Sequence, residues 1–261
     1  MREPDEAGHA DLDDHRLEFN RFESREPGAP SLVLLHEGLG SVAMWRDFPA
    51  KLAATTGAEV FVYSRRGYGT SSPRAMPYDV DYMHAEARET LPRLFEVWGL
   101  EAPVLVGHSD GASVALIHAA QENPRAQAVC VMAPHIMVEP ISIQSIEVAR
   151  EQFRTTDLAA KLARYHDDPE HAFRGWNDIW LHPDFLNWDI RPLLPAIRCP
   201  VMAIQGEDDP YGTMAQVDGI EAASGGPVAL VKLPGCGHSP HREAPDETLR
   251  ALKTFVEKIG Q

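Results

Sequence analysis

The sequence predicts an α/β fold in which a mainly parallel central sheet is flanked by helices. Six short apolar runs recur along the chain without polar alternation, which is typical of strands buried on both faces of a parallel sheet. Segments with helical spacing lie between several of these runs, and strands that alternate with helices define this fold class. With 261 residues, the chain is long enough to bury a sizeable core in one large domain.

Each predicted strand is an apolar run of three to six residues, a usual strand length. In chain order they are LVLL (32–35), VFVY (60–63), VLV (104–106), AVCVMA (128–133), VMAI (201–204) and VALVKL (228–233).

Two segments show clear helical spacing of apolar residues. In 83–98 these residues recur every three or four positions, and Pro92 is expected to kink the helix or to start its second half. In 247–259 the apolar residues fall on one face, which predicts a helix packed against the core.

The interval 135–198 contains no convincing strand. Charged, helix-favouring pieces such as SIEVAREQFRTTDLAAKLARYHDD are followed by the aromatic-rich segment AFRGWNDIWLHPDFLNWDI. We therefore predict a core made of residues 1–134 and 199–261, with residues 135–198 inserted as a helical cap over one edge of the sheet.

Composition excludes several classes of function. The formal net charge of −15 argues against nucleic acid or an anionic membrane surface as a partner, because both need clustered Lys and Arg. Cys130, Cys199 and Cys236 are widely spaced and odd in number, so neither a disulfide framework nor a structural zinc site is expected.

The acidic N-terminus and the lack of a long apolar stretch predict a soluble, cytoplasmic protein. The oligomeric state stays open.

The stretch GHSDG (107–111) is the strongest chemical signal. It fits G-x-S-x-G, it follows an apolar strand, and it precedes ASVALIHAA, which can form a helix. A serine in such a strand-to-helix turn is strained and exposed, and small residues two positions away allow the strand and helix to approach. Ser109 is therefore the predicted nucleophile.

A serine hydroxyl needs a base, and the base needs an orienting group. His238 lies in LPGCGHSPH, after the last apolar run, which makes it the predicted base rather than His241. Glu207, Asp208 and Asp209 lie in IQGEDDPYG, directly after the preceding strand. The chain order is thus serine, acid, histidine.

On these residues the chain resembles the α/β-hydrolase superfamily over about 31–258, in its cofactor-free form with a helical cap between the sixth and seventh strands. The resemblance implies that Asp209, three residues after Gly206, is the acid of the triad, with Asp208 as the alternative. It implies no metal, nucleotide or organic cofactor.

The resemblance also implies an oxyanion hole with two backbone N–H donors. Asp110, after the serine, is one expected donor, and Gly38 in HEGLGS is the other. Glu37 stands where the family usually has glycine, and we expect its carboxylate to point away from the site or to pair with Arg65 or Arg66.

Other conspicuous residues have a structural and a functional interpretation. Trp45, Trp176, Trp180 and His135 are the candidates to line an apolar substrate pocket. His36 and His108 are expected to support the backbone around their motifs, and Asp110 could also cap a helix. Four potential metal ligands also lie close together in the sequence, but their spacing matches no tetrahedral zinc site, and we expect them on a solvated surface. They are His166, Asp167, Asp168 and His171.

The predicted activity is hydrolysis of a small carboxylic ester or related acyl compound, with an apolar or aromatic acyl group, through an acyl-enzyme. A carbon–carbon bond hydrolase of aromatic ring-cleavage products and a lactonase remain alternatives, because cap and pocket geometry set the substrate. A small-ligand receptor on the same fold is the alternative of another class.

Overall fold

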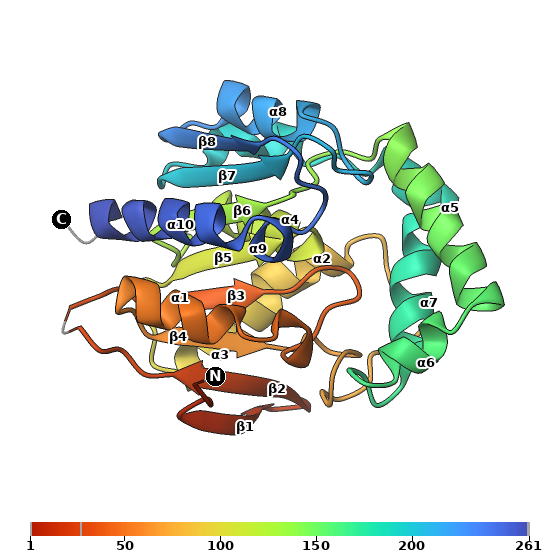
Figure 1. Ribbon diagram of the computed structural model, residues 1–261, viewed down its shortest axis with the longest axis horizontal. Coiled ribbons are helices and arrows are strands. Elements are labelled where there is room, and N and C mark those ends of the chain that lie inside the picture. The colour runs from red at the N-terminus through yellow and green to blue at the C-terminus, as the bar shows by residue number, and fades with distance from the viewer. Residues whose placement is uncertain (1, 27, 260–261) are drawn as a thin grey trace.

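The computed structural model describes residues 2–26 and 28–259, and an eight-stranded sheet forms its centre (Figure 1). Strand order across the sheet is β1-β2-β4-β3-β5-β6-β7-β8. β2 runs antiparallel to both of its neighbours, β1 and β4, and the six strands from β3 to β8 are parallel to one another. The strands are β1 (Glu6–Leu12), β2 (His15–Phe22), β3 (Leu32–Leu35), β4 (Val60–Tyr63), β5 (Val104–His108), β6 (Ala128–Met132), β7 (Val201–Gly206) and β8 (Val228–Leu233).

Helices follow most of the parallel strands, as the alternating pattern predicts. The α-helices are α1 (Phe48–Thr56), α2 (Tyr82–Ala85), α3 (Leu91–Val97), α4 (Asp110–Ala119), α5 (Pro140–Thr155), α6 (Leu158–Leu162), α7 (Pro169–Trp180), α8 (Ala215–Ala223), α9 (Pro240–Glu243) and α10 (Pro245–Ile259). The shorter 3₁₀ and π segments are η1 (Ala43–Trp45), η2 (Glu86–Thr90), η3 (Pro183–Asn187) and η4 (Arg191–Ala196). α3 begins at Leu91, directly after the π-helical η2, and Pro92 lies in its first turn, so the predicted interruption of 83–98 is confirmed.

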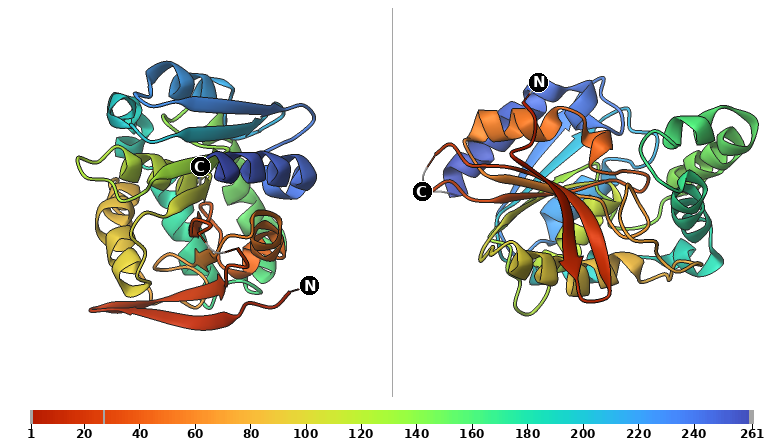
Figure 2. Two further views of the ribbon diagram at one scale, coloured as in Figure 1. Left: turned by 90° about the vertical axis from the view of Figure 1, so that its left-hand side faces the viewer. Right: turned by 90° about the horizontal axis from the view of Figure 1, so that it is seen from below.

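The sheet separates two hydrophobic cores. Alternate residues of each central strand face opposite sides, so Val33 and Leu35 join one core while Leu32 and Leu34 join the other. Helices α1 and α10 cover the second core, and α3, α4 and α8 cover the first (Figure 2). Burial on both faces explains the apolar runs of β3, β4, β5, β6 and β7, whereas β8, at the edge of the sheet, is only partly buried. The predicted fold class is confirmed.

The N-terminal hairpin of β1 and β2 was not predicted. β2 pairs with β4 and extends the sheet on that side, while β1 is the outermost strand. Most β1 side chains are exposed and several are charged, because an edge strand has few neighbours to bury them. A pattern based on buried apolar runs therefore cannot detect this strand.

The segment between β6 and β7, residues 135–198, carries α5, α6 and α7 and is here called the inserted segment. It stands apart from the sheet, on the side toward which the arrows of β3 and β7 point (Figure 1). It contributes no strand to the sheet, although Met137 and Asp189 form one isolated antiparallel bridge. Within the described ranges, none of the helices is long and apolar enough to cross a membrane.

Candidate active site

Ser109 occupies a sharp turn between β5 and α4. Its φ of 52° and ψ of −119° lie in a region that L-residues rarely adopt. Glycine is required on both sides: a Cβ at Gly107 would lie 2.4 Å from the Gly111 carbonyl oxygen, and one at Gly111 would lie 2.2 Å from that of Leu35. The turn thus pushes the serine side chain away from the backbone that surrounds it.

Ser109, His238 and Asp209 form a continuous chain of hydrogen bonds. The Ser109 hydroxyl lies 3.0 Å from Nε2 of His238, and Nδ1 of His238 lies 2.9 and 2.8 Å from the two carboxylate oxygens of Asp209. The serine and the acid are buried, and the histidine keeps about 16% of its side-chain surface exposed. A base placed between a hydroxyl and a carboxylate can take the hydroxyl proton while its charge is stabilised.

The carboxylate at the end of this series of hydrogen bonds belongs to Asp209, which is buried, whereas Asp208 is exposed. Gln205 donates to one carboxylate oxygen of Asp209 at 2.7 Å, and the N–H of Tyr211 donates to the other at 2.8 Å. Burial raises the pKa of Asp209, but its bond to His238 and the other donors outweigh that effect, so the pKa lies below its ordinary value. The carboxylate is therefore held ionised.

His238 reaches Asp209 because its loop passes close to the end of β7. A Cβ at Gly206 would lie 2.2 Å from the carbonyl oxygens of both Cys236 and Gly237, so only glycine allows this approach. Nε2 of His108 donates to the His238 carbonyl oxygen at 2.7 Å. This bond agrees with the structural role that the sequence suggests for His108.

The loop after β3 is held by His36 and Arg65. Nε2 of His36 accepts the N–H of Arg65 at 2.9 Å, and the guanidinium of Arg65 donates to the carbonyl oxygens of His36 and Glu37. Gly38 is packed under the indole of Trp176, where a Cβ would lie 2.1 Å from Cδ1. Gly38 and Asp110, the two expected oxyanion donors, line the same cavity as Ser109.

Glu37 does not pair with an arginine side chain. Its carboxylate lies 3.5 Å from Nδ1 of His108, with about 17% of its side chain exposed, and the residue lines the cavity beside Ser109. Burial raises the pKa of Glu37, yet the interaction of its carboxylate with His108 holds that pKa well below the ordinary value. Among the described residues, neither Arg65 nor Arg66 forms an ion pair with this carboxylate, so the expected pairing with one of these arginines is wrong.

Asp110 does not cap a helix with its side chain. Its carboxylate is fully buried and accepts hydrogen bonds from the Tyr82 hydroxyl and from Nε1 of Trp180, the latter at 3.3 Å. Burial raises the pKa of Asp110 above its ordinary value. The residue therefore connects α4 to α7 and fixes the Trp180 ring over the serine turn.

A cavity of about 230 Å³ opens at Ser109. Leucine, isoleucine, methionine and tryptophan side chains form much of its wall. Its lining residues are Glu37, Gly38, Leu39, Met44, Ser109, Asp110, His135, Ile146, Leu158, Leu162, Trp176, Trp180, Tyr211 and His238.

Three of the four predicted pocket residues, His135, Trp176 and Trp180, line this cavity. His135 is buried, its Nδ1 has no partner among the described residues, and burial lowers its pKa to about 3, so the ring is neutral. Trp45 is placed elsewhere. It is 2% exposed and stacks on Phe48 in the core under α1, because η1 turns its ring toward the sheet.

Within the charged group at 166–171, His166 does not lie on a solvated surface as expected. His166 is buried, Nδ1 accepts the N–H of Gly69 at 3.0 Å, and Nε2 donates to the Leu39 carbonyl oxygen at 2.9 Å. Where the structure describes the chain, no three potential metal ligands come together. His166 instead joins the inserted segment to two loops of the core.

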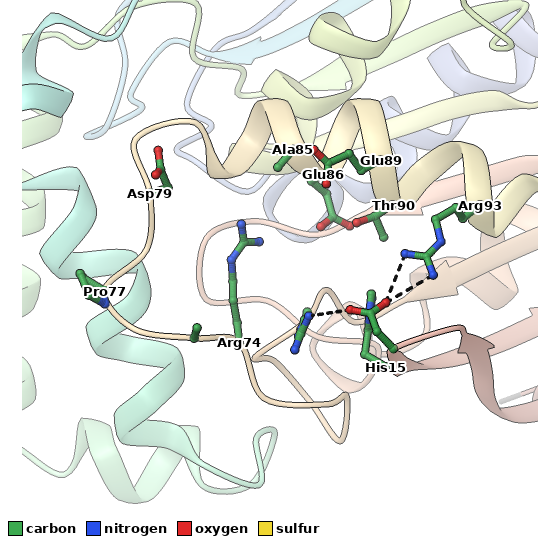
Figure 3. A pocket seen from close by; sticks show the side chains of 12 residues that line it. His15, Arg74, Pro77, Asp79, Ala85, Glu86, Glu89, Thr90 and Arg93 are labelled. Atoms are coloured by element: carbon green, nitrogen blue, oxygen red, sulfur yellow. Dashed lines mark hydrogen bonds and ion pairs between the residues drawn. The ribbon is translucent and has the colours of Figure 1, made fainter.

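A separate hollow of about 360 Å³ lies away from the serine, between the β1–β2 turn and the helix that carries Glu86 and Arg93 (Figure 3). Two of its arginines, Arg66 and Arg93, form ion pairs with Asp14 in its wall. It contains no serine or cysteine nucleophile among its lining residues. The cavity at Ser109 is therefore the candidate active site.

Sequence reasoning missed several residues of the site. Gln205 could have been found, because a polar side chain that ends the otherwise apolar strand VMAIQG just before an acidic turn needs a partner. The aliphatic wall carried no such signal, because Leu39, Met44, Ile146, Leu158 and Leu162 look like ordinary core residues in the sequence.

Comparison with known proteins agrees with this fold. A model of the alpha/beta hydrolase family matches residues 32–251. Epoxide hydrolase A of Mycobacterium tuberculosis is 26% identical in an alignment that covers 94% of this chain and 96% of that protein. The 2-hydroxy-6-oxo-6-phenylhexa-2,4-dienoate hydrolase of Comamonas testosteroni is 22% identical in an alignment that covers 94% of this chain and 93% of that protein.

Among solved structures, proline iminopeptidase of Mycobacterium smegmatis superposes with a TM-score of 0.77 at 18% identity, covering 98% of this chain and 99% of that one. At this identity the match shows a common fold. Together with the family model, it places the chain in the alpha/beta hydrolase family, and the protein is a hydrolase.

Proposed function

We propose that the protein hydrolyses a small carboxylic ester or related acyl compound through an acyl-enzyme formed on Ser109. The observation that supports this most directly is the hydrogen-bonded chain from Asp209 through His238 to Ser109, which ends in a largely apolar cavity. Family membership alone would not distinguish this reaction from others, because one fold serves many chemistries.

In the first half of the reaction, Ser109 Oγ attacks the acyl carbon while His238 accepts the hydroxyl proton. Asp209 stabilises the imidazolium that forms. The backbone N–H groups of Gly38 and Asp110 donate to the oxygen as it becomes negative. Collapse of the tetrahedral intermediate then expels the alcohol, which takes the proton from His238, and leaves the acyl group on Ser109.

In the second half, a water molecule gives a proton to His238 and attacks the acyl carbon of the ester on Ser109. The released carboxylic acid leaves, and Ser109 regains its proton from His238. The inserted segment serves as a cap in this proposal. Its Trp176 and Trp180 side chains surround the acyl group and exclude bulk water.

Covalent labelling tests the proposal directly. A tagged fluorophosphonate is expected to label Ser109, and the His238→Ala variant is expected to label far more slowly because its hydroxyl has no base. Ser109→Ala should lose activity on the order of a millionfold. Unlabelled Ser109 in folded wild-type protein would contradict the proposal and favour a ligand-binding role instead.

A carbon–carbon bond hydrolase is the second candidate, since the Comamonas relative is named for a dienoate substrate. The same serine and histidine would serve that reaction, so labelling does not separate the two. Turnover of nitrophenyl esters compared with a ring-cleavage dienoate does separate them. A lactone in the same panel tests the third hydrolytic activity.

A further inference from the structure

Glu37 is the one residue of the candidate site whose position contradicts what the chemistry of the oxyanion hole leads one to expect. A carboxylate beside the acyl carbon opposes the negative charge that develops there. Its backbone is nevertheless fixed, because Nη2 of Arg65 and Nδ1 of His36 both donate to the Glu37 carbonyl oxygen, at 2.9 and 2.6 Å. The side chain therefore belongs to a rigid loop, and its place in the cavity wall follows from that loop.

The groups that face the cavity carry no compensating cation. Neither lysine nor arginine is among the lining residues. His135 is neutral, since burial lowers its pKa to about 3. The Arg65 guanidinium is buried behind the loop, where it binds backbone carbonyls and has two acids, Asp110 and Glu86, as neighbours. Near the site there are therefore more carboxylates than arginine side chains, because Arg65 is the one arginine described there.

The nearest group that could carry positive charge is His108, whose Nδ1 lies 3.5 Å from the Glu37 carboxylate. Its side chain is 1% exposed, whereas that of Glu37 is about 17% exposed. The Glu37 side chain, which belongs to a lining residue of the cavity, therefore keeps some surface free, whereas the imidazole is enclosed. His241, on the far side of His108, is buried, and burial holds its pKa well below the ordinary value, so it too adds no charge.

We propose that Glu37 makes this site selective by charge, so that the substrate is a neutral or positively charged acyl compound and compounds with a carboxylate near the acyl carbon are rejected. The inference rests on the proposed ester hydrolysis and narrows its substrate class. It also separates this chain from a dienoate hydrolase, because a dienoate brings its own carboxylate into the cavity, where two like charges in partly desolvated surroundings repel each other.

The test uses three nitrophenyl esters with the same short acyl chain, which ends in a methyl, a carboxylate or a trimethylammonium group. Wild-type kcat/KM for the anionic ester is expected to be lower than for the neutral ester by about tenfold or more, and the cationic ester is expected to equal or exceed the neutral one. In Glu37→Gln, the ratio of anionic to neutral kcat/KM should rise about tenfold.

Glu207→Gln is the matched control, because it makes the same chemical change at an exposed position outside the cavity. It should keep the wild-type ratio. Equal wild-type rates on the three esters, or the same ratio in Glu37→Gln as in wild type, would overturn the inference while leaving the proposed function intact.

Labelling rates make the test independent of turnover. If none of the esters is hydrolysed, neutral and anionic fluorophosphonate probes are compared on Ser109 in the same variants. Preference for the neutral probe that falls in Glu37→Gln supports the inference, and equal rates overturn it. Absence of any labelling shows that the proposed function itself has failed, and with it this inference.

Discussion

The two sides of the cavity are built differently. The core side presents Ser109, His238, Asp209 and Gly38 from loops that follow strands of the sheet, and each is held by hydrogen bonds or by close backbone packing. The inserted segment contributes mainly apolar side chains, such as Leu162 and Trp176. The comparison teaches that rigid backbone positions the reacting groups, whereas the surfaces of helices shape the space for the acyl group.

The two sides are also joined at specific points. Trp180 donates to Asp110, Trp176 covers Gly38, and His166 binds the Leu39 and Gly69 backbone. Each of these contacts places a residue of the inserted segment against a loop of the core that adjoins the serine. Variants that affect one side, or the contact between the two, should therefore have separable effects.

The largest effect is expected on the core side. Asp209→Asn should lower kcat by about 10⁴-fold, because the amide cannot stabilise the imidazolium and favours the wrong tautomer of His238. Asp208→Asn, one residue away and exposed, should change kcat less than about threefold. Steady-state kinetics on one ester decides this, and a larger loss in Asp208→Asn would contradict the assignment of the acid.

An intermediate effect is expected where the two sides touch. Gly38→Ala forces a Cβ toward Trp176 and should displace the N–H donor, lowering kcat by about 10²- to 10³-fold. Trp176→Ala removes the clashing ring and should mainly raise KM, because it removes apolar wall. The double variant should recover part of the lost kcat. Strictly additive losses would show that Trp176 does not constrain the oxyanion loop.

The smallest effect concerns stability. Burial lowers the pKa of His166, whose Nδ1 accepts the Gly69 N–H, so the folded protein binds a proton there less readily than the unfolded chain. This contribution to the free energy of unfolding is fully present above the unfolded pKa of about 6.5 and is lost as the pH falls below it. Denaturant unfolding between pH 7 and 5 measures the slope.

His166→Gln should reduce this slope by at most about 1.4 kcal/mol per pH unit, the equivalent of one proton. His182→Gln, at a side chain that is about half exposed, is the control and should keep the wild-type slope. An unchanged slope in His166→Gln would show that His166 takes up no proton on unfolding in this range.

Several elements could be predicted because they depend on neighbours in sequence. The strands at 32–35, 60–63 and 228–233 coincide with β3, β4 and β8. Strands buried on both faces are apolar at consecutive positions, which a sequence pattern detects. The glycines of G-x-S-x-G are needed for the close packing of β5 on α4, so five residues indicate this turn. β1 was not predicted, because most of its residues are exposed and do not form an apolar run.

Other features depend on segments that are distant in sequence. Trp45 and Trp176 are the same residue type, yet one is packed under α1 and the other covers Gly38. The Glu37 carboxylate lies beside His108, 71 positions away along the chain, whereas Arg65 binds the Glu37 backbone rather than its carboxylate. Such pairings follow from how loops and helices pack, which no local pattern records.

By itself, the sequence determined the α/β class, the positions of the six parallel strands from β3 to β8 and the order of serine, acid and histidine, because burial and turn geometry restrict residue types locally. Only the tertiary structure decided that Asp209 rather than Asp208 meets His238, and which aliphatic side chains form the cavity wall. Adjacent carboxylates are chemically alike, so the direction in which the chain leaves β7 selects one of them. The same packing places Glu37 in the wall of the cavity.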